Sequence, residues 1–248
     1  MAKQSGLGDS LLLDGYDLSG DVGAVEVIAA RDAPLVVTAI DKSALERILG
    51  HHDGELGFTS FFNDATDQEH DVLKVPGGTN RIACWLRGGG TIGKAGYGIV
   101  AKQLNYDPNR AQDGSLTIGV QALGALYGGE FADQLTPGLR TDTGATEGSS
   151  LNNGAASSKG LSAYLQVTAF TGTDVTITIE QSSDNGVGDA FAAVTGGAFA
   201  QVTTAPVAER IVTSLSQAVE QYLRVTTTTS AGFTSVTFVV LVFRGPRA

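Results

Sequence analysis

The chain has 248 residues, of which 33 are glycine, only 17% are charged, and the formal net charge is −10. Abundant Gly, Thr, Val and Ala suit strands and turns, so the composition argues against a mostly helical protein and excludes a coiled coil, a collagen-like chain and a disulfide-rich scaffold. The acidic balance also argues against nucleic-acid binding, which needs a basic surface to neutralise phosphates.

A short helix of about two turns is predicted at residues 43–50. Ser43 and Glu46 match a capping box, in which the hydroxyl and the carboxylate satisfy free backbone donors at a helix N-terminus. Gly50 can end such a helix. The residues at helical spacing that form its apolar stripe are Leu45, Ile48 and Leu49.

Strands are predicted on both sides of this helix. Their bounds are 35–40, 55–62 and 81–87. Phe58, Phe61 and Phe62 could form an aromatic ligand platform, but we assign them to the core because Leu56 and Phe58 share a face and the helix stripe needs a partner.

A long hairpin is predicted next, with strands at 97–106 and 115–123 joined by a loop at 107–114. One face alternates apolar residues, and the other is small, polar and nearly uncharged. Solvated sheet faces normally carry Lys and Glu, which discourage strand addition. The neutral face therefore indicates contact with another subunit or a lined channel.

Residues 141–160 are rich in Gly, Ser, Thr, Asn and Ala and have no apolar periodicity, which predicts a flexible linker. We therefore predict two domains, at residues 11–140 and 161–248.

The second domain is predicted to be a small β-sandwich, because short Thr- and Val-rich strands recur at regular spacing. Strands at 164–170 and 175–179 are expected to form a hairpin. The other strands are expected at 199–203, 209–213, 221–228 and 235–244. The last of these is apolar on both faces, which predicts a central, two-sided strand.

One stretch nearly matches a phosphate-binding loop. Residues 88–95 read GGGTIGKA, but Ala95 stands where a Ser or Thr should hold magnesium, and a strand follows where a helix is needed. We interpret the stretch as an inter-strand loop.

Two polar groups could be imagined as metal sites. His51, His52 and Asp53 with the distant His70 are interpreted as a surface turn, because adjacent side chains diverge. Residues 182–189 lack the spacing and terminal Glu of an EF-hand and are interpreted as a polar hairpin turn.

Cys84 is alone, which excludes an intrachain disulfide, and its apolar neighbours predict a buried thiol. We predict no catalytic residue, no cofactor and no metal, and therefore no enzyme.

The stretch 48–63, ILGHHDGELGFTSFFN, resembles a segment of the tail tube (major tail) proteins of long-tailed bacteriophages, in which a short helix, an Asp-Gly turn and a strand with paired aromatics follow one another. Residues 97–121 look like the long hairpin of that family. Residues 163–244 are similar to accessory β-sandwich modules attached to such proteins.

The resemblance implies a mainly β fold, with a tail-tube-like barrel or sandwich, a short flanking helix and a C-terminal β-sandwich. Six copies would close into a ring, and rings would stack into the virion's tail tube, assembled in the host cytoplasm. DNA and the tape-measure protein would pass through the channel without specific DNA binding, and tail terminator and tip proteins would bind the tube ends. No membrane is involved. A trimeric ring of duplicated domains remains an alternative symmetry.

On this hypothesis the hairpin carries the inner barrel and its loop contacts a neighbouring subunit. The subunit-interface candidates are Asp107, Pro108, Asn109, Arg110, Asp113 and Gly114. The lumen-face candidates are Gln103, Asn105, Ser115, Thr117 and Gln121. The alternative function is a carbohydrate-binding or adhesion module that decorates the virion surface.

Overall fold

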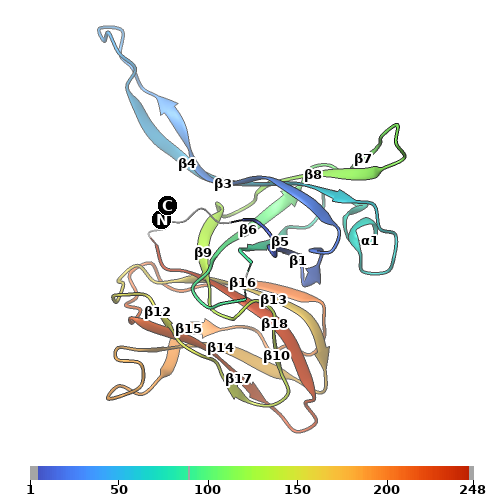
Figure 1. Cartoon of the computed structure of the whole chain (residues 1–248). Coiled ribbons are helices and arrows are strands. Elements are labelled where there is room, and N and C mark those ends of the chain that lie inside the picture. Colours follow the sequence, from blue (N-terminus) through green and yellow to red (C-terminus); the bar gives the residue numbers. More distant parts are fainter. Residues whose placement is uncertain (1–4, 89, 246–248) are drawn as a thin grey trace.

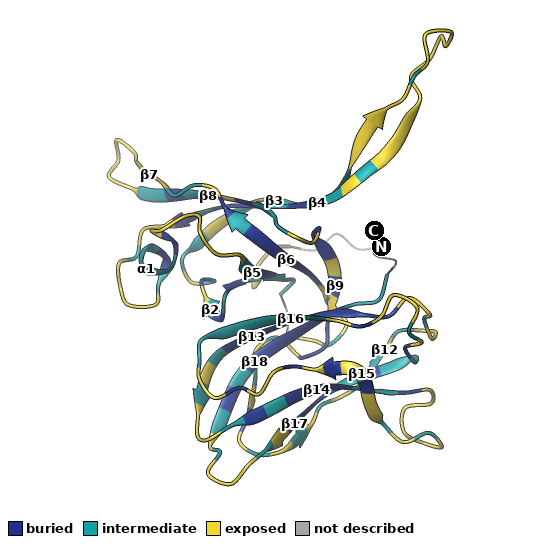
Figure 2. Ribbon diagram, turned by 180° about the vertical axis from the view of Figure 1, so that it is seen from behind, coloured by how far each residue is buried: buried dark blue, intermediate teal, exposed yellow. Residues whose placement is uncertain are grey.

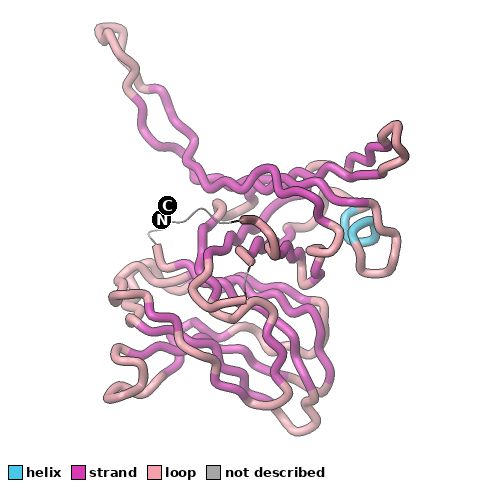
Figure 3. Tube along the Cα trace, viewed as in Figure 1, coloured by secondary structure: helices cyan, strands magenta, loops and turns pink. Residues whose placement is uncertain are grey.

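The computed structural model describes residues 5–88 and 90–245 and is almost entirely β, which confirms the predicted fold class (Figures 1 and 3). The elements of the N-terminal half are β1 (Ser10–Leu13), β2 (Tyr16–Asp17), β3 (Val22–Val36), β4 (Arg47–Phe61), α1 (Glu69–Leu73), β5 (Arg81–Leu86), β6 (Ala95–Gln103), β7 (Asp107–Arg110), β8 (Leu116–Gly124) and β9 (Glu130–Gln134). The elements of the C-terminal half are β10 (Arg140–Asp142), β11 (Thr146–Glu147), β12 (Leu151–Asn152), β13 (Ser162–Thr171), β14 (Val175–Ser182), β15 (Ala192–Ala198), β16 (Val207–Val212), β17 (Tyr222–Thr229) and β18 (Ser235–Phe243).

The N-terminal half is a curled antiparallel sheet that encloses its own core. β1 pairs with β2 and β5, β5 pairs with β6, and β6 continues to both β8 and β9. β8 also pairs with β4, which pairs with β3. Alternate side chains of these strands point inward, as the period of two requires. Leu11, Phe58, Tyr97, Ile99 and Ile118 are among the buried residues of this core.

The C-terminal half is a sandwich. β16, β13, β18 and β10 form one layer, and β11, β12, β17, β14 and β15 form the other. Inward side chains of both layers make one core, which includes Val167, Ile177, Val225, Phe238 and Val240. This alternation is what the Thr- and Val-rich pattern predicts.

β18 joins the halves and is central and two-sided, as predicted. It pairs with β13 and β10, and also with β9 of the N-terminal half. Val239 and Leu241 are fully buried on the face opposite to the sandwich core, in a cluster that includes Cys84 and Tyr164. The Tyr164 ring lies so close to β6 that a Cβ on Gly98 would approach it to 2.5 Å, so only glycine fits there.

The predicted hairpin of residues 164–170 and 175–179 is wrong, although both strands exist. β13 pairs with β16 and β18, whereas β14 pairs with β15 and β17 in the opposite layer. The turn between them therefore crosses from one layer to the other. Alternation predicts an inward face but does not say which strand lies alongside.

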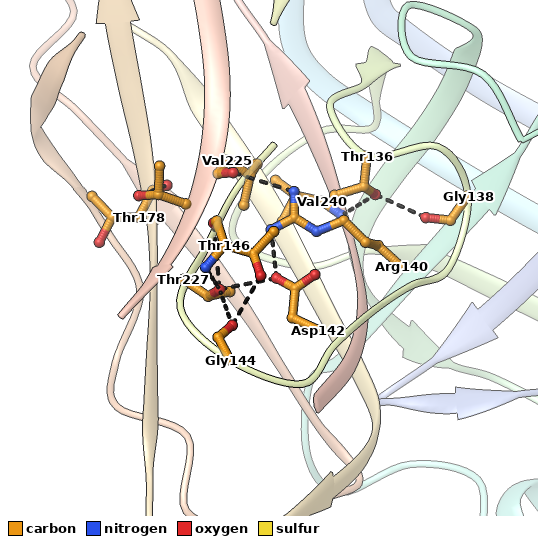
Figure 4. Close-up of polar contacts among 11 residues, drawn as sticks. Thr136, Gly138, Arg140, Asp142, Gly144, Thr146, Thr178, Val225, Thr227 and Val240 are labelled. Atoms are coloured by element: carbon orange, nitrogen blue, oxygen red, sulfur yellow. Dashed lines mark hydrogen bonds and ion pairs between the residues drawn. The ribbon is translucent and has the colours of Figure 1, made fainter. Parts of the chain in front are cut away.

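The predicted flexible linker is also wrong, because residues 141–160 contain β11, β12 and most of β10, which pair with β17 and β18. Arg140 donates to the buried Asp142 carboxylate (2.7 Å), and the Thr227 hydroxyl donates to the same carboxylate (2.9 Å; Figure 4). This segment is therefore held in the sandwich by strand pairing and by side-chain hydrogen bonds. The division into domains at 11–140 and 161–248 stays a prediction.

The predicted helix at 43–50 is the third correction. These residues form the end of a long hairpin and the start of β4, where Leu35 pairs with Ile48 and Pro34 with Leu49. The backbone N–H of Glu46 donates to the Thr38 hydroxyl at 2.8 Å, in place of the expected capping box. A two-turn helix without a core to pack on is marginal, and strand pairing satisfies more backbone groups. Within residues 5–88 and 90–245, the helix lies later, at α1.

Candidate assembly surface

The sheet formed by β3, β4, β8 and β7 has two free edges. Within the described ranges, β3 pairs only with β4 and β7 pairs only with β8. The β3 edge runs for 15 residues, from Val22 to Val36. A strand edge presents unpaired N–H and C=O groups that can bind a strand of another chain. The two edges lie on opposite sides of one sheet, which is the arrangement that allows copies to join edge to edge.

The two faces of this sheet differ in chemistry. Leu56, Phe58, Ile118 and Val120 point into the barrel core. The outward positions Gly57, Thr59 and Phe61 pair with the outward positions Gln121, Gly119 and Thr117 of β8. The outer face is therefore built from small and polar residues in its centre.

Acidic groups dominate the charge of the outer face. The Gln121 amide donates to Glu55 at 2.8 Å, and Arg31 forms an ion pair with the same carboxylate. The Thr59 hydroxyl donates to Glu26 at 2.5 Å. Glu26 is exposed, whereas the Glu55 side chain is largely covered, with 12% of its surface accessible beside Arg31. Two carboxylates and one guanidinium therefore leave this part of the face hydrogen-bonded and negatively charged.

Two of the five lumen-face candidates lie on this face, and two more lie next to strand β8. Thr117 and Gln121 lie on the face, and Asn105 accepts a hydrogen bond from the Gln121 backbone N–H at 2.6 Å. Ser115 is exposed in the turn that precedes β8. Their role in a channel stays a prediction.

Gln103 is the lumen-face candidate that does not lie near the outer face, so its prediction is corrected. Its side chain is buried, donates to the Leu73 carbonyl at 2.8 Å and accepts from Arg81 at 3.0 Å. β6 is buried on both faces between β5 and β8, so its alternation does not separate a core face from a channel face. Gln103 therefore fastens α1 to the barrel.

The six interface candidates lie together at the end of the β7–β8 hairpin. Residues 107–110 form the exposed strand β7, so half of the predicted loop extends the sheet. Asp113 and Gly114 form the turn, in which the backbone and hydroxyl of Ser115 donate to Asp113 and lower its pKa. The predicted pairing of the hairpin's long strands is confined to residues 101–103 and 122–124, since β8 pairs mainly with β4.

A projecting arm is the feature that the sequence patterns missed. Beyond the pair of Glu55 with Leu123, β4 leaves β8, and residues 30–54 extend as a two-stranded hairpin into solvent (Figures 1 and 2). We call these residues the arm. Its exposed large apolar side chains are Leu35, Val36, Val37, Ile40, Leu45, Ile48 and Leu49. Local sequence signals instead assign part of this apolar set to a helix that packs on the core, so the arm was missed.

His52 anchors the base of the arm. Its Nδ1 lies 2.8 Å from the Asp32 carboxylate on β3, and its Nε2 lies 3.2 Å from the Gly129 carbonyl before β9. A Cβ on Gly128 would overlap the imidazole ring, so glycine is required beside it. His52 thus connects both arm strands to the barrel.

The histidines do not form the predicted surface turn. His51 and His52 lie within β4, and His70 lies in α1, where its Nδ1 is 2.6 Å from the Tyr106 hydroxyl. In the described part of the chain, no group of three or more His, Cys, Asp or Glu side chains could hold a metal ion.

The three phenylalanines that were assigned to the core do not share one environment. Phe58 is buried in the core as predicted, whereas Phe61 and Phe62 are exposed, because they lie at and beyond the end of β4. His70 packs against Phe62 at a ring distance of 4.9 Å.

The remaining motifs have structural roles. The stretch 88–95 connects β5 to β6 as an inter-strand loop, with residue 89 outside the described ranges. Asp184 accepts backbone hydrogen bonds from residues 187–189 in the β14–β15 turn, which lowers its pKa. Cys84 is fully buried, and desolvation raises its pKa to about 12. No described helix is long and apolar enough to cross a membrane.

Comparisons with known proteins return matches among solved structures only. No protein-family model and no curated protein matches the chain. A chain from the virion of a native gene transfer agent particle matches with 14% identity and a TM-score of 0.39, over 52% of this chain and 98% of its own.

A chain from the tail of an empty gene transfer agent particle with C6 symmetry matches with 14% identity and a TM-score of 0.33, over 50% of this chain and 95% of its own. The Dit protein of phage SPP1, described as a hub of the adsorption apparatus, matches with 12% identity and a TM-score of 0.32, over 95% of this chain and 99% of its own. These TM-scores lie below 0.5, so the function proposed next rests on the geometry of the chain itself.

Proposed function

We propose that the chain is a structural virion protein whose copies assemble into rings that stack into a phage tail tube, the conduit for DNA ejection. The observation that carries the proposal is the sheet β3–β4–β8–β7, which combines two free edges with a polar, acidic outer face. This assignment includes no catalytic role and no cofactor.

Ring closure follows from the two edges. β3 of one copy pairs with β7 of the next, so the four strands of each copy join one continuous barrel. Such a head-to-tail contact uses two different patches and closes when the rotation between copies divides a full turn. Closure removes the free edges, which would otherwise recruit strands without limit. Six copies per ring is the first choice and three is the alternative.

The outer face of the sheet becomes the channel wall. Glu26 and Glu55 lie on it, and the chain carries a net charge of −10. A wall of the same sign as the phosphate backbone repels DNA, so DNA can slide without specific binding. The tape-measure protein would fill the same channel before ejection, and tail terminator and tip proteins would contact the exposed ring ends.

Replacing residues 107–114 with a short Gly-Ser turn tests the proposal. The replacement removes the β7 edge but leaves the barrel core, so we expect a folded monomer that forms neither rings nor tubes in negative-stain electron microscopy. A Gly-Ser replacement of residues 184–188, in the distant β14–β15 turn, is the matched control and should assemble. Normal tubes from the first variant would exclude β7 as the joining edge.

The adhesion alternative draws less support from the structure. Carbohydrate platforms need exposed aromatic rings, and Tyr164, Phe199 and Phe238 of the C-terminal half are buried. Phe170 and Phe233 pack against each other at 6.2 Å between ring centroids. Binding of glycans or host cells by the full chain, lost when the sandwich surface is altered, would favour this second function.

A further inference from the structure

An apolar groove of about 490 Å³ lies between β9 and β16, at the base of the arm. Four of its apolar lining residues are exposed large side chains, namely Leu126, Phe131, Val212 and Leu215. A contiguous set of large exposed apolar side chains around a hollow is typical of an interaction site.

The charged groups at the floor of the groove are paired with each other. The Arg210 guanidinium binds both oxygens of Glu130 at 3.0 and 3.1 Å, and both side chains are nearly completely buried. Tyr164 donates its hydroxyl to the same carboxylate, and the Tyr127 ring covers Arg210 at 4.0 Å. Because these charges are paired within the chain, an occupant of the groove would contact mainly its apolar side chains.

The arm carries the complementary surface. Its large apolar side chains are exposed on both strands and the tip, with Ile40 fully in solvent and Leu49 at 74% exposure. At about 3.3 Å per residue, strand β3 carries the pair of Leu35 with Ile48 about 15–20 Å beyond Ala30, and the tip of the arm lies further out. That reach is comparable to the radius of gyration of a domain of this size, about 18 Å. The arm can therefore cross to a neighbouring copy.

Edge pairing alone gives too little contact to hold copies together. β7 offers four residues, Asp107–Arg110, to a neighbour. A stable interface between proteins commonly buries about 1,200–2,000 Å², which is much more than a four-residue strand supplies. The missing area must be apolar and must lie outside the sheet edge, and the arm and the groove both meet this requirement.

We infer that the arm of one copy docks in the groove of a second copy of this chain. The inference deepens the proposed function, since it supplies the second contact of the same assembly. The exposed apolar part of the arm and the groove are different patches, although Ala30, Asp32 and His52 at the base of a copy's own arm also line its groove. Each copy therefore gives one arm and receives one, and the contact propagates around a ring or along a stack. Leu49 and Ile48 would fill the space between Phe131, Val212 and Leu215.

Disulfide trapping tests the contact in the full chain. Ile48→Cys on the arm and Leu215→Cys in the groove are combined in one protein, in which the native Cys84 is buried and unreactive. Mild oxidation is expected to give a covalent ladder of dimers and higher species. The matched control pairs Ile48→Cys with Val187→Cys, an exposed position on a sandwich turn, and should remain at least ten-fold poorer in covalent dimer.

Mixing two blocked variants gives the second readout. Ile48→Asp blocks the arm and Leu215→Asp blocks the groove, and each protein alone is expected to lose assembly. Mixed in equal amounts, the free arm of one fits the free groove of the other, so we expect a discrete 1:1 dimer by analytical ultracentrifugation. Both substitutions are at exposed positions, so the monomers should fold normally.

The outcomes separate this inference from the proposed function. Rings or tubes that form normally without a ladder, and with both blocked variants, would overturn arm docking while leaving the tube. Monomers at every concentration would overturn both. A disulfide between the two introduced cysteines that stays within one chain, or a bound oligosaccharide displaced by Leu215→Asp, would assign the groove to another occupant and also overturn the inference.

Discussion

The C-terminal sandwich and the arm both carry large apolar residues, but the sandwich buries them and the arm exposes them. In the sandwich, Phe238, Val240 and Ile177 are completely buried between two layers. In the arm, Leu49, Ile48 and Leu35 are as apolar but lie in solvent on a bare two-stranded hairpin. An isolated hairpin is at best marginally stable in water. The sandwich therefore buries its apolar residues within one chain, whereas the arm does not, and the proposed docking on a second copy would bury them.

The largest expected effect is a loss of stability when the sandwich core is changed. Phe238→Ala removes a fully buried ring from the core, and large-to-small core changes of this kind cost about 4 kcal/mol. We expect that loss in the free energy of unfolding, measured by chemical denaturation of the monomer. A loss below about 1 kcal/mol would show that the sandwich core is not what stabilises the chain.

The next effect concerns the floor of the groove. Arg210→Met leaves Glu130 buried without its partner, and breaking a buried ion pair costs about 3 kcal/mol. The double variant Arg210→Met, Glu130→Gln removes both charges and should recover more than half of the loss. If the single and double variants are equally unstable, the ion pair contributes through packing and not through charge compensation.

A pH effect of about 2–3 kcal/mol is expected at α1. Glu69 is fully buried, and desolvation, together with Asp21, raises its pKa from 4.5 to about 7 against the opposing hydrogen bond from Ser60. The folded state therefore holds a proton that the unfolded state releases. This contribution to stability is complete below pH 4.5 and is lost as the pH rises through 7.

Glu69→Gln is the matched test of that effect. It should flatten the dependence of unfolding free energy between pH 4.5 and 7 and stabilise the protein at neutral pH. An unchanged slope would mean that Glu69 is ionised in the folded state at acidic pH, and would remove the assigned cause.

The smallest effect on the stability of the monomer is expected in the arm. Ile48→Ser at an exposed position should change the unfolding free energy by less than about 0.5 kcal/mol while it reduces assembly in sedimentation experiments. A stability loss comparable to that of Phe238→Ala would show that the arm packs within its own chain.

Sequence patterns predict the sandwich better than the arm, for a physical reason. Alternation in residues 175–179 reports directly which face is buried, and β14 confirms it, since Val175, Ile177 and Ile179 are fully buried. The apolar run at 235–244 has no such alternation and forms β18, which is buried on both faces as predicted. Partner choice is not encoded locally, so alternation alone pairs β13 with β14 in one hairpin although they lie in opposite layers.

In the arm, local sequence signals predict the wrong secondary structure. Ser43, Glu46 and the Leu45–Leu49 stripe satisfy every local rule for a helix, yet no core lies beside them. Pairing of β3 with β4 therefore decides the conformation. Similarly, the polar residues of 141–160 resemble a linker because their hydrogen-bond partners, such as Thr227 for Asp142, lie far away in sequence. The interface candidates within residues 107–114 could be proposed from sequence, but the position of residues 107–110 on a free strand edge could not.

The most direct measurement is cryo-electron microscopy of the assembled full chain at a resolution that separates strands. Assembly through the two free edges predicts rings in which β3 of one copy runs beside β7 of the next. Glu26, Glu55 and Gln121 would then face a central channel. Rings in which both edges remain unpaired, or isolated particles at every concentration, would contradict it.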